Sequence, residues 1–237
     1  MGNPYLLLWL EAPLQSWGHD SRFGRRESLG FPTKSGVLGL LCCALGAGGQ
    51  QKDLLAEFAD LDMQLISYSR ADLSGAALPR EPLLRDFQMV GSGYDDADPW
   101  QSLLIPKTSG GKKAVGGGTK MTYRYYLQDM CFAVAIQVPE RWVQQLAAAL
   151  QNPVWDLFLG RKSCVPTELI YQGRFDSAVQ AFERSLTLAL DKQRAFGFRV
   201  VQGAAVGEVL TLNDVPLEFG QRKRYRDRQV TVQERRE

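Results

Sequence analysis

A change in the alternation of apolar residues within residues 121–138 restricts the fold more than any other feature of the sequence. Large apolar residues occupy odd positions up to Leu127 and even positions from Phe132 onward. Successive side chains of a strand point to opposite faces of a sheet, so a change from odd to even positions exchanges the buried face. The sequence therefore predicts a β-bulge at residues 128–130, or a passage there from a projecting strand to a core strand.

The residues before this passage have the composition of a projection rather than of a core. Residues 91–99 are rich in Gly and Asp, and residues 106–120 are rich in Gly, Lys and Thr. Such stretches bring too few apolar side chains to bury a core of their own. We predict that residues 82–126 form an arm inserted between two parts of one core, residues 1–81 and residues 127–237.

Residues 31–46 predict a buried helix with a polar beginning. Pro32 disfavours helix before it, Thr33 can serve as N-cap, and apolar residues then recur at helical spacing until a glycine ends the run. Lys34 and Ser35 lie in the first turn, where unpaired N–H groups and the helix dipole favour an anion. A phosphate bound at this end is one interpretation, and a capped core helix with a solvated lysine is the other.

The remaining sequence predicts a mixed α+β protein. Residues 5–10 form an apolar run typical of a central strand, and residues 61–69 alternate like a half-buried strand. Helices are also expected at residues 51–59, 140–151 and 175–185, and strands at residues 186–190, 196–201 and 209–212. The basic residues at 222–228 are consistent with a solvated chain end.

Composition excludes several classes of protein. The chain of 237 residues has no apolar run near the roughly 20 residues of a membrane helix and no secretion signal, so we expect a cytoplasmic protein. Its four cysteines lack the spacing of a zinc site or a disulfide framework. A P-loop requires glycine before its lysine, and this chain has Thr33 before Lys34. We expect no metal, no cofactor and no NTPase activity.

The positive signal is a set of basic, glycine-interrupted loops that contain aromatic residues. Residues 99–128 carry five basic residues and no acidic one. Basic and aromatic residues cluster at several places: Trp17 with Arg22 and Arg25, Arg85 with Phe87, Arg124 with Tyr123 and Tyr125, and Arg161 with Lys162. Cations that follow phosphates and rings that stack on bases are how proteins bind single-stranded nucleic acid. The sequence therefore predicts an RNA-binding protein.

Catalysis is the competing interpretation. His19 is the one histidine of the chain, and Lys34 or Lys162 is a candidate oxyanion partner for a metal-independent endoribonuclease that processes repeat RNA. A single histidine in a loop is more often a contact residue than a catalyst. We therefore expect no catalytic residue and keep the ribonuclease as the alternative.

Five motifs, taken together and in order, resemble the CasD family. They are Leu-Glu-Ala-Pro-Leu-Gln-Ser-Trp-Gly at 10–18, Phe-Pro-Thr-Lys-Ser-Gly-Val-Leu-Gly-Leu-Leu at 31–41, Leu-Leu-Arg-Asp-Phe at 83–87, Tyr-Arg-Tyr-Tyr-Leu-Gln-Asp at 123–129 and Leu-Gly-Arg-Lys-Ser-Cys at 159–164. This family is the RAMP-type subunit of Cascade, the type I-E CRISPR surveillance complex of antiviral defence. The resemblance implies a ferredoxin-like core, related to RRM domains, with an inserted β-hairpin thumb that corresponds to the arm at residues 82–126.

The resemblance also implies a function and partners. Members of this family hold the repeat-derived 5′ handle of CRISPR RNA without cutting it, because a separate subunit, CasE, cuts the repeat. The thumb packs against the backbone subunit CasC, the large subunit CasA lies close by, and target DNA is bound through the assembled complex. Related subunits of another subtype cleave the repeat with a tyrosine on the first helix and a lysine–histidine pair in the thumb, and this sequence has neither feature.

Carried onto this sequence residue by residue, the resemblance implies an RNA-binding site spread over five regions. Handle phosphates are expected at Pro32, Thr33, Lys34, Ser35 and Gly36, and hooked nucleotides at Gln15, Trp17 and Gly18. The thumb is expected to contribute Arg85, Phe87, Lys107, Arg124 and Tyr125, and the opposite wall Arg161, Lys162 and Ser163. Arg25 completes the set from the basic loop after Gly18.

Overall fold

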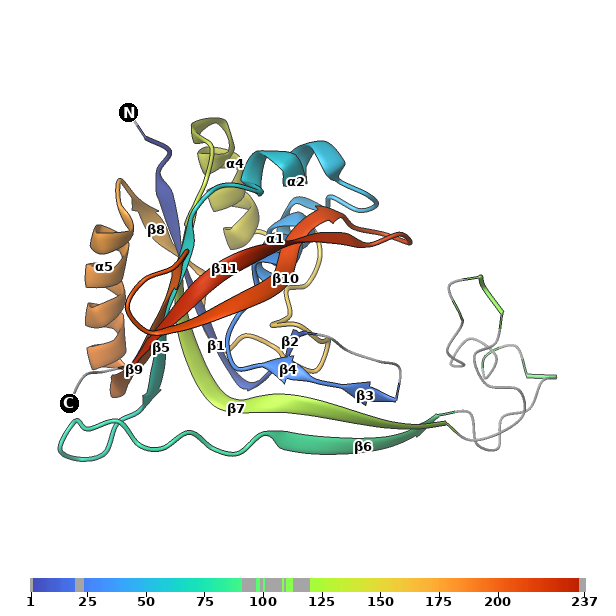
Figure 1. Ribbon diagram of the computed structural model, residues 1–237, viewed down its shortest axis with the longest axis horizontal. Helices are drawn as coiled ribbons and strands as arrows, with labels where there is room; N and C mark the ends of the chain where they lie inside the picture. The colour runs from blue at the N-terminus through green and yellow to red at the C-terminus, as the bar shows by residue number, and fades with distance from the viewer. Residues whose placement is uncertain are drawn as a thin grey trace.

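Strands that form one large sheet and helices that cover it make up the body of the protein (Figure 1). The computed structural model describes residues 2–19, 24–90, 97–98, 100, 108, 110–112 and 120–234. The elements in chain order are β1 (Tyr5–Gln15), β2 (Trp17–Gly18), β3 (Arg25–Arg26), β4 (Ser28–Leu29), α1 (Lys34–Leu45), α2 (Lys52–Phe58), β5 (Met63–Arg70), β6 (Leu84–Val90), β7 (Lys120–Gln137), α4 (Glu140–Gln151), β8 (Tyr171–Phe175), α5 (Ala178–Asp191), β9 (Arg194–Gln202), β10 (Glu208–Glu218) and β11 (Arg224–Glu234).

Antiparallel pairing joins most strands into a single sheet. The main path runs β10-β11-β9-β5-β7-β1-β8, and β3 and β6 pair with β7 outside this path. Strands β2 and β4 form a small sheet of their own. The predicted mixture of strands and helices is confirmed. No helix in the described part of the chain is long and apolar enough to cross a membrane.

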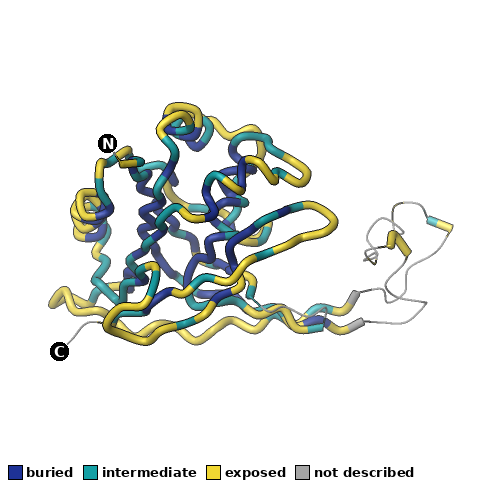
Figure 2. Tube along the Cα trace, turned by 45° about the horizontal axis from the view of Figure 1, so that its top comes forward, coloured by how far each residue is buried: buried dark blue, intermediate teal, exposed yellow. Residues whose placement is uncertain are grey.

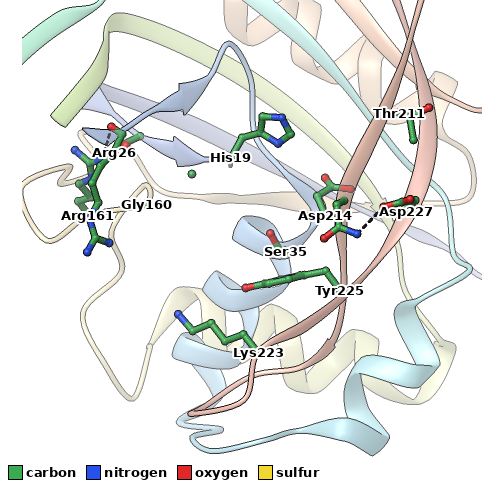
Figure 3. Close-up of a pocket in the computed structure, with 13 residues that line it drawn as sticks. His19, Arg26, Ser35, Gly160, Arg161, Thr211, Asp214, Lys223, Tyr225 and Asp227 are labelled. Atoms are coloured by element: carbon green, nitrogen blue, oxygen red, sulfur yellow. Dashed lines mark hydrogen bonds between the residues drawn. The ribbon is translucent and has the colours of Figure 1, made fainter. Parts of the chain in front are cut away.

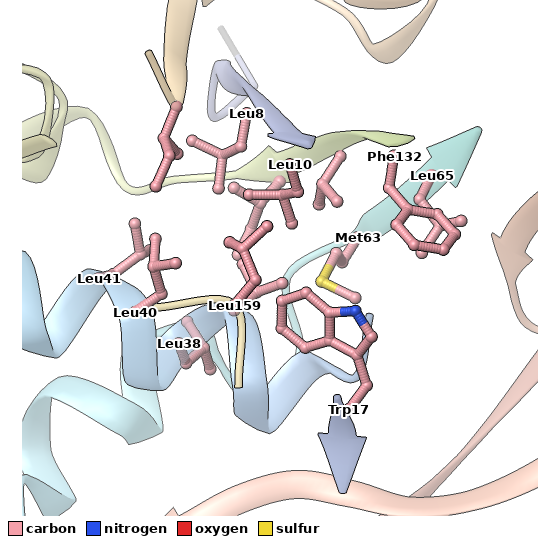
Figure 4. Close-up of a cluster of buried hydrophobic side chains, with 14 of the residues drawn as sticks. Leu8, Leu10, Trp17, Leu38, Leu40, Leu41, Met63, Leu65, Phe132 and Leu159 are labelled. Carbon is pink, nitrogen blue, oxygen red and sulfur yellow. The ribbon is translucent and has the colours of Figure 1, made fainter. Parts of the chain in front are cut away.

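Strand β1 lies at the centre of the core, which explains its continuous apolar run. Leu8 and Leu10 pack on the side of α1 and α4, whereas Leu7 and Trp9 pack on the side of α5. Figure 4 shows Leu8 and Leu10 in the cluster that α1 closes. Burying each side chain of this size contributes about 1.5–3 kcal/mol to the free energy of folding. Strand β1 therefore holds a helical layer on each face of the sheet.

Strand β7 runs without interruption from the arm into the core. It pairs with β6 as far as Tyr126 and with β5 from Cys131 onward, so it exchanges one neighbour for another between these residues. Asp129 lies within this interval and has a left-handed backbone with φ of 48°. The register with β1 does not shift there. The change in alternation therefore marks a passage from arm to core, and not a bulge between β1 and β7.

The arm is the ribbon of β6 and β7 that projects from the body, with β3 along part of it (Figure 2). The apolar odd-numbered residues of β7, such as Met121 and Tyr123, are exposed there, whereas Thr122 and Tyr126 on the even-numbered side are buried. The apolar pattern of the arm thus faces outward and not into a core.

The predicted helices at 51–59 and 140–151 and the predicted strands at 5–10, 61–69, 196–201 and 209–212 are confirmed with shifted boundaries. Two other predictions for the C-terminal third are wrong. Residues 186–190 continue α5, where Leu186 and Leu190 lie on the exposed side. Residues 222–228 are not a frayed end, because β11 pairs with β10 and β9 and buries Val230. Strand β8 was not predicted.

Candidate nucleic-acid interface

Two adjoining cavities, which we call the groove, open beside the beginning of α1. Figure 3 draws the residues that line the larger one. The larger has a volume of about 810 Å³ and the smaller of about 300 Å³. Four segments that are far apart in the sequence meet here: the turn after β1, the beginning of α1, the loop after α4, and the hairpin β10–β11. The residues common to both cavities are Ser16, Gly18, Ser35, Gly160, Lys223 and Tyr225.

A further cavity of about 550 Å³ lies between the arm and the loop of residues 159–164, and we call it the arm cavity. It brings together six residues that the sequence predicts on opposite walls of one site: Arg85, Phe87, Arg124, Arg161, Lys162 and Ser163. Arg161 also lines the larger cavity of the groove. The groove and the arm cavity therefore meet at this side chain.

Arg161 has a hydrogen-bonding atom to spare at this junction. Its Nη2 donates to the carbonyl oxygen of Arg26 at 3.1 Å, and its guanidinium lies 4.7 Å from the centre of the Tyr126 ring. Its Nη1 is buried and has no hydrogen-bond partner among the described residues. Leaving a buried donor unpaired costs about 1–3 kcal/mol. A phosphate oxygen or a base acceptor bound between the two cavities would remove this cost.

The loop that carries Arg161 is packed directly on the turn after β1. The backbone N–H of Ser16 donates to the carbonyl oxygen of Leu159 at 3.0 Å. Gly160 has φ of 103°, and a Cβ at this position would lie 1.7 Å from the carbonyl oxygen of Ser16. Only glycine fits between the two segments, so this contact fixes where Arg161 stands.

We expect the substitution Gly160→Ala to lower the free energy of unfolding by about 2–4 kcal/mol, because it adds a steric clash to backbone strain. Gly203→Ala is the matched control. Gly203 has φ of 82°, but a Cβ added there would meet no atom within 4 Å, so this variant carries the strain without the clash. Urea denaturation of both variants gives the comparison. Equal losses of stability would show that the approach of Ser16 has no effect.

The anion expected at the beginning of α1 is supplied by the protein itself. Thr33 is the N-cap, as predicted, and its Oγ1 accepts from the N–H of Gly36 at 3.1 Å. The N–H of Lys34 donates to Oδ2 of Asp214 at 2.7 Å. Arg228 holds the same carboxylate through Nε at 2.7 Å and Nη2 at 2.9 Å. A carboxylate from β10 thus occupies the position that the sequence assigned to a phosphate.

The side chain of Lys34 points away from the groove. It is 1% exposed, and its Nζ donates to the carbonyl oxygens of Ala59 at 2.9 Å and Leu61 at 2.6 Å. Burial, together with the charge of Arg228, lowers the pKa of Lys34 to about 8. The predictions that Lys34 contacts a phosphate or assists His19 are therefore wrong. Its amine instead ties the chain after α2 to α1.

The side chains of Gln15 and Trp17 also form contacts inside the protein. Gln15 is fully buried, and its Nε2 donates to the carbonyl oxygens of Leu10 at 3.0 Å and Met130 at 2.7 Å. Its Oε1 accepts from Nε1 of Trp17 at 3.1 Å. The Trp17 ring lies so close to Gly36 that a Cβ there would approach to 2.8 Å. Two of the recognised motifs therefore lock each other in place.

These contacts correct part of the predicted site. Gln15 and Pro32 line neither the groove nor the arm cavity, and their side chains are buried. Trp17 and Thr33 border the smaller cavity as buried parts of its wall. Gly18, Ser35 and Gly36 lie at the surface of the groove, and their contacts with RNA stay a prediction.

On the arm, several predicted side chains stack on one another. Arg25 lies over Tyr125 at 5.2 Å, Arg85 lies over Tyr123 at 5.7 Å, and the rings of Phe87 and Tyr123 are 5.4 Å apart. These side chains share the outward, odd-numbered side of the arm, whereas Arg124 and Tyr126 belong to the even-numbered side. Lys107, predicted for the same region, lies outside the described residues.

The hairpin β10–β11 supplies a wall of the groove that the sequence did not reveal. Its contributions to the larger cavity are Thr211, Asn213, Asp214, Lys223, Tyr225 and Asp227. The feature of the sequence that could have revealed this wall is the basic run at 222–228, whose side chains point alternately to the two faces of the strand. Lys223 and Tyr225 consequently face the groove (Figure 3), whereas Arg226 reaches Asp60 and Arg228 reaches Asp214.

The side chains that line the groove differ from the catalytic set considered for a ribonuclease. His19 lines the larger cavity, but neither lysine considered as its oxyanion partner does. Within the described ranges, no three His, Cys, Asp or Glu side chains gather as metal ligands would. Arg26, Arg161 and Lys223 bring positive charge to the larger cavity, which Asp227 and the Arg228-paired carboxylate of Asp214 also line. Such a lining can attract anionic groups, and it offers the ring of Tyr225 for stacking.

Comparison with known proteins supports the same family as the motifs. A model of the family described as CRISPR-associated protein (Cas_Cas5) matches residues 5–231. A relative from Escherichia coli (strain K12), "CRISPR system Cascade subunit CasD", is 28% identical over 179 residues, which cover 71% of this chain and 70% of the relative.

Solved structures also share the fold. A chain of a "CRISPR RNA-guided surveillance complex" has a TM-score of 0.68 and 26% identity, over 96% of this chain and 88% of that chain. A second structure, "Crystal structure of Cas protein", has a TM-score of 0.59 and 26% identity, over 98% of this chain and 94% of that chain. The resemblance inferred from the motifs is confirmed, and the chain belongs to the Cas5 family of CRISPR-associated proteins.

Proposed function

We propose that this protein is a subunit of a Cascade-type surveillance complex that binds the 5′ handle of CRISPR RNA and does not cut it. The observation that carries the proposal is the position of Arg161 between two cavities, with one buried donor unpaired. An extended RNA strand is a ligand that can occupy both cavities at once and offer an acceptor at their junction. The relative named as a Cascade subunit agrees with this proposal.

In this proposal the strand runs from the groove past Arg161 into the arm cavity. Phosphates lie near cations on both sides, and bases stack on Tyr225 in the groove and on the Arg161 guanidinium, which itself lies over the buried ring of Tyr126. The proposed ligand set keeps Gly18, Arg25, Ser35, Gly36, Arg85, Arg124, Tyr125, Arg161, Lys162 and Ser163 from the sequence, and adds Arg26, Lys223 and Tyr225. Phe87, also predicted as an RNA ligand, is assigned to the partner surface of the arm instead.

We further propose that the body is a ferredoxin-like core, residues 1–81 and 127–237, and that the arm, residues 82–126, is its thumb. The chain order β1, α1, β5, β7, α4, β8 and the spatial order β8-β1-β7-β5 support this assignment. Both orders match a β-α-β-β-α-β unit in which all neighbouring strands are antiparallel.

The outward side of the arm supports a partner. Phe87 lies opposite Tyr123, and Met89 lies opposite Met121, so two exposed apolar pairs stand side by side on the ribbon. Exposed apolar patches of this kind mark interaction surfaces. We assign this surface to the CasC backbone subunit, with CasA nearby, target DNA bound by the assembled complex, and the whole located in the cytoplasm. Protection of the arm from proteolysis by purified CasC tests the assignment, and cleavage at an unchanged rate would refute it.

Incubation of the purified protein with repeat RNA in the presence of a chelator tests the function itself. We expect retention of handle RNA, binding that weakens with added salt, and no cleavage, because the affinity comes from phosphate contacts. Unrelated RNA of the same length is the control. Specific cleavage that disappears in His19→Ala would instead establish the alternative, a metal-independent ribonuclease.

A further inference from the structure

The arm leaves the core at a residue with an uncommon backbone conformation. On one edge of β7, pairing with β6 ends at Tyr126 and pairing with β5 begins at Cys131. Asp129 lies in the interval with φ of 48°, a conformation that residues with a Cβ seldom adopt and that costs about 1 kcal/mol. On the other edge, β1 accompanies β7 as far as Leu127. Along the first edge, no strand ladder fixes the direction of the arm.

Arg194 supplies hydrogen bonds to β7 in the interval where neither β6 nor β5 pairs with it. From the beginning of β9, its Nη1 donates to the carbonyl oxygen of Asp129 at 3.0 Å, and its Nη2 donates to Oδ1 of Asp129 at 2.9 Å. The same Nη2 lies 2.7 Å from Oε1 of Glu11 on β1. The Arg194 side chain is 9% exposed. One guanidinium therefore joins β9, β7 and β1 where the arm begins.

The charges around this guanidinium are balanced. Arg70 lies 3.5 Å from Asp129, and Lys192 lies 3.9 Å from Glu11 and is also paired with Glu168. The cluster thus holds three basic and three acidic side chains: Arg70, Lys192 and Arg194 with Glu11, Asp129 and Glu168. No charge is left over to attract a ligand, so the arrangement is suited to holding the backbone and not to binding.

We infer that Arg194 is a positioning residue, which holds β7 at Asp129 and thereby sets the distance between the arm and the loop that carries Arg161. A strand advances about 3.3 Å per residue, so Arg124 lies roughly 16 Å along β7 from the pivot. A rotation of about 10° at the pivot moves it by about 3 Å, which is the length of a hydrogen bond. The contact of Arg194 with Asp129 thus adds to the pairing of β1 with β7 in keeping the width of the arm cavity.

The test compares Arg194→Met with the control Arg174→Met. Arg174 forms exposed ion pairs with Glu140 and Asp176 and lines neither the groove nor the arm cavity. In Arg194→Met we expect hydrogen exchange to rise about tenfold at backbone amides of residues 84–90 and 120–126, with the core strands unchanged. The affinity for handle RNA should fall about tenfold, an expectation that rests on the proposed function. Arg194→Lys keeps the charge but not the forked donors of the guanidinium. It should therefore restore part of the slow exchange in the arm and part of the affinity for handle RNA.

Three outcomes overturn the inference: unchanged exchange in the arm, faster exchange that is equal throughout the sheet, or a loosened arm that binds RNA as tightly as the wild type. The failure of the proposed function looks different. If the wild-type protein binds no handle RNA, the RNA-binding assignment is refuted, while exchange in the arm still decides whether Arg194 holds it.

Discussion

Asp214→Asn is expected to lower the free energy of unfolding by about 3–5 kcal/mol, because it leaves the charge of Arg228 buried without its counterion. The two side chains are 3% and 8% exposed, so water cannot replace the lost partner. The same carboxylate accepts the first N–H of α1. Removing its charge therefore weakens the attachment of β10–β11 to α1 as well as the ion pair. Urea denaturation monitored by circular dichroism measures the loss.

Asp227→Asn is the matched control for this prediction. Asp227 lies on the same hairpin and also accepts a hydrogen bond, from Asn213 at 2.5 Å, but it is exposed. Its substitution should change stability by no more than about 0.5 kcal/mol. The double variant Asp214→Leu with Arg228→Met should recover part of the loss, since no charge is then buried alone. Equal effects of Asp214→Asn and Asp227→Asn would contradict the assigned role of the pair.

Arg161→Ala is expected to weaken the binding of handle RNA by about 10- to 100-fold without unfolding the protein. The substitution removes a charge-assisted hydrogen bond worth about 1.5–3 kcal/mol and a stacking plane over Tyr126. The loss of one phosphate contact should also reduce the slope of log affinity against log salt by about 0.7. Fluorescence anisotropy over a salt series measures both quantities.

Two further variants make this result specific. Arg174→Ala removes an arginine that lines neither the groove nor the arm cavity, and should leave affinity and salt slope unchanged. Lys34→Ala should lower stability and leave the salt slope as it is, because the amine of Lys34 serves two carbonyl oxygens inside the protein. If Arg161→Ala bound handle RNA with wild-type affinity and slope, the path through the junction would be refuted.

Local patterns explain why part of the fold was predictable from the sequence. The helix at residues 31–46 and the change of alternation before Phe132 each depend on neighbours within a few residues. Strand β11 depends instead on distant segments, because its basic residues form a wall of the groove only when β10 and β9 pair with it. The strand predicted at residues 186–190 failed because an apolar run of that length fits a helix equally well.

The site was harder to predict, because burial decides the role of a polar residue and a motif does not reveal burial. Gln15 and Lys34 have the side chains of RNA ligands, yet each is buried and donates to two backbone carbonyl oxygens. Arg161 has the same kind of side chain and keeps one donor unpaired. The difference arises from segments that meet only in the folded protein, such as the carbonyl oxygen of Leu61 beside α1.

The central position of β1 also determines when the protein can fold during its synthesis. Its neighbours in the sheet are residues 127–137 and residues 171–175, which are translated long after it. At about 5–20 residues per second, a ribosome needs roughly 6–24 s to progress from residue 15 to residue 137. Throughout this time the apolar run from Leu6 to Leu10 belongs to a nascent chain without a partner strand, and we expect chaperones that act on emerging polypeptides to raise the yield of this protein.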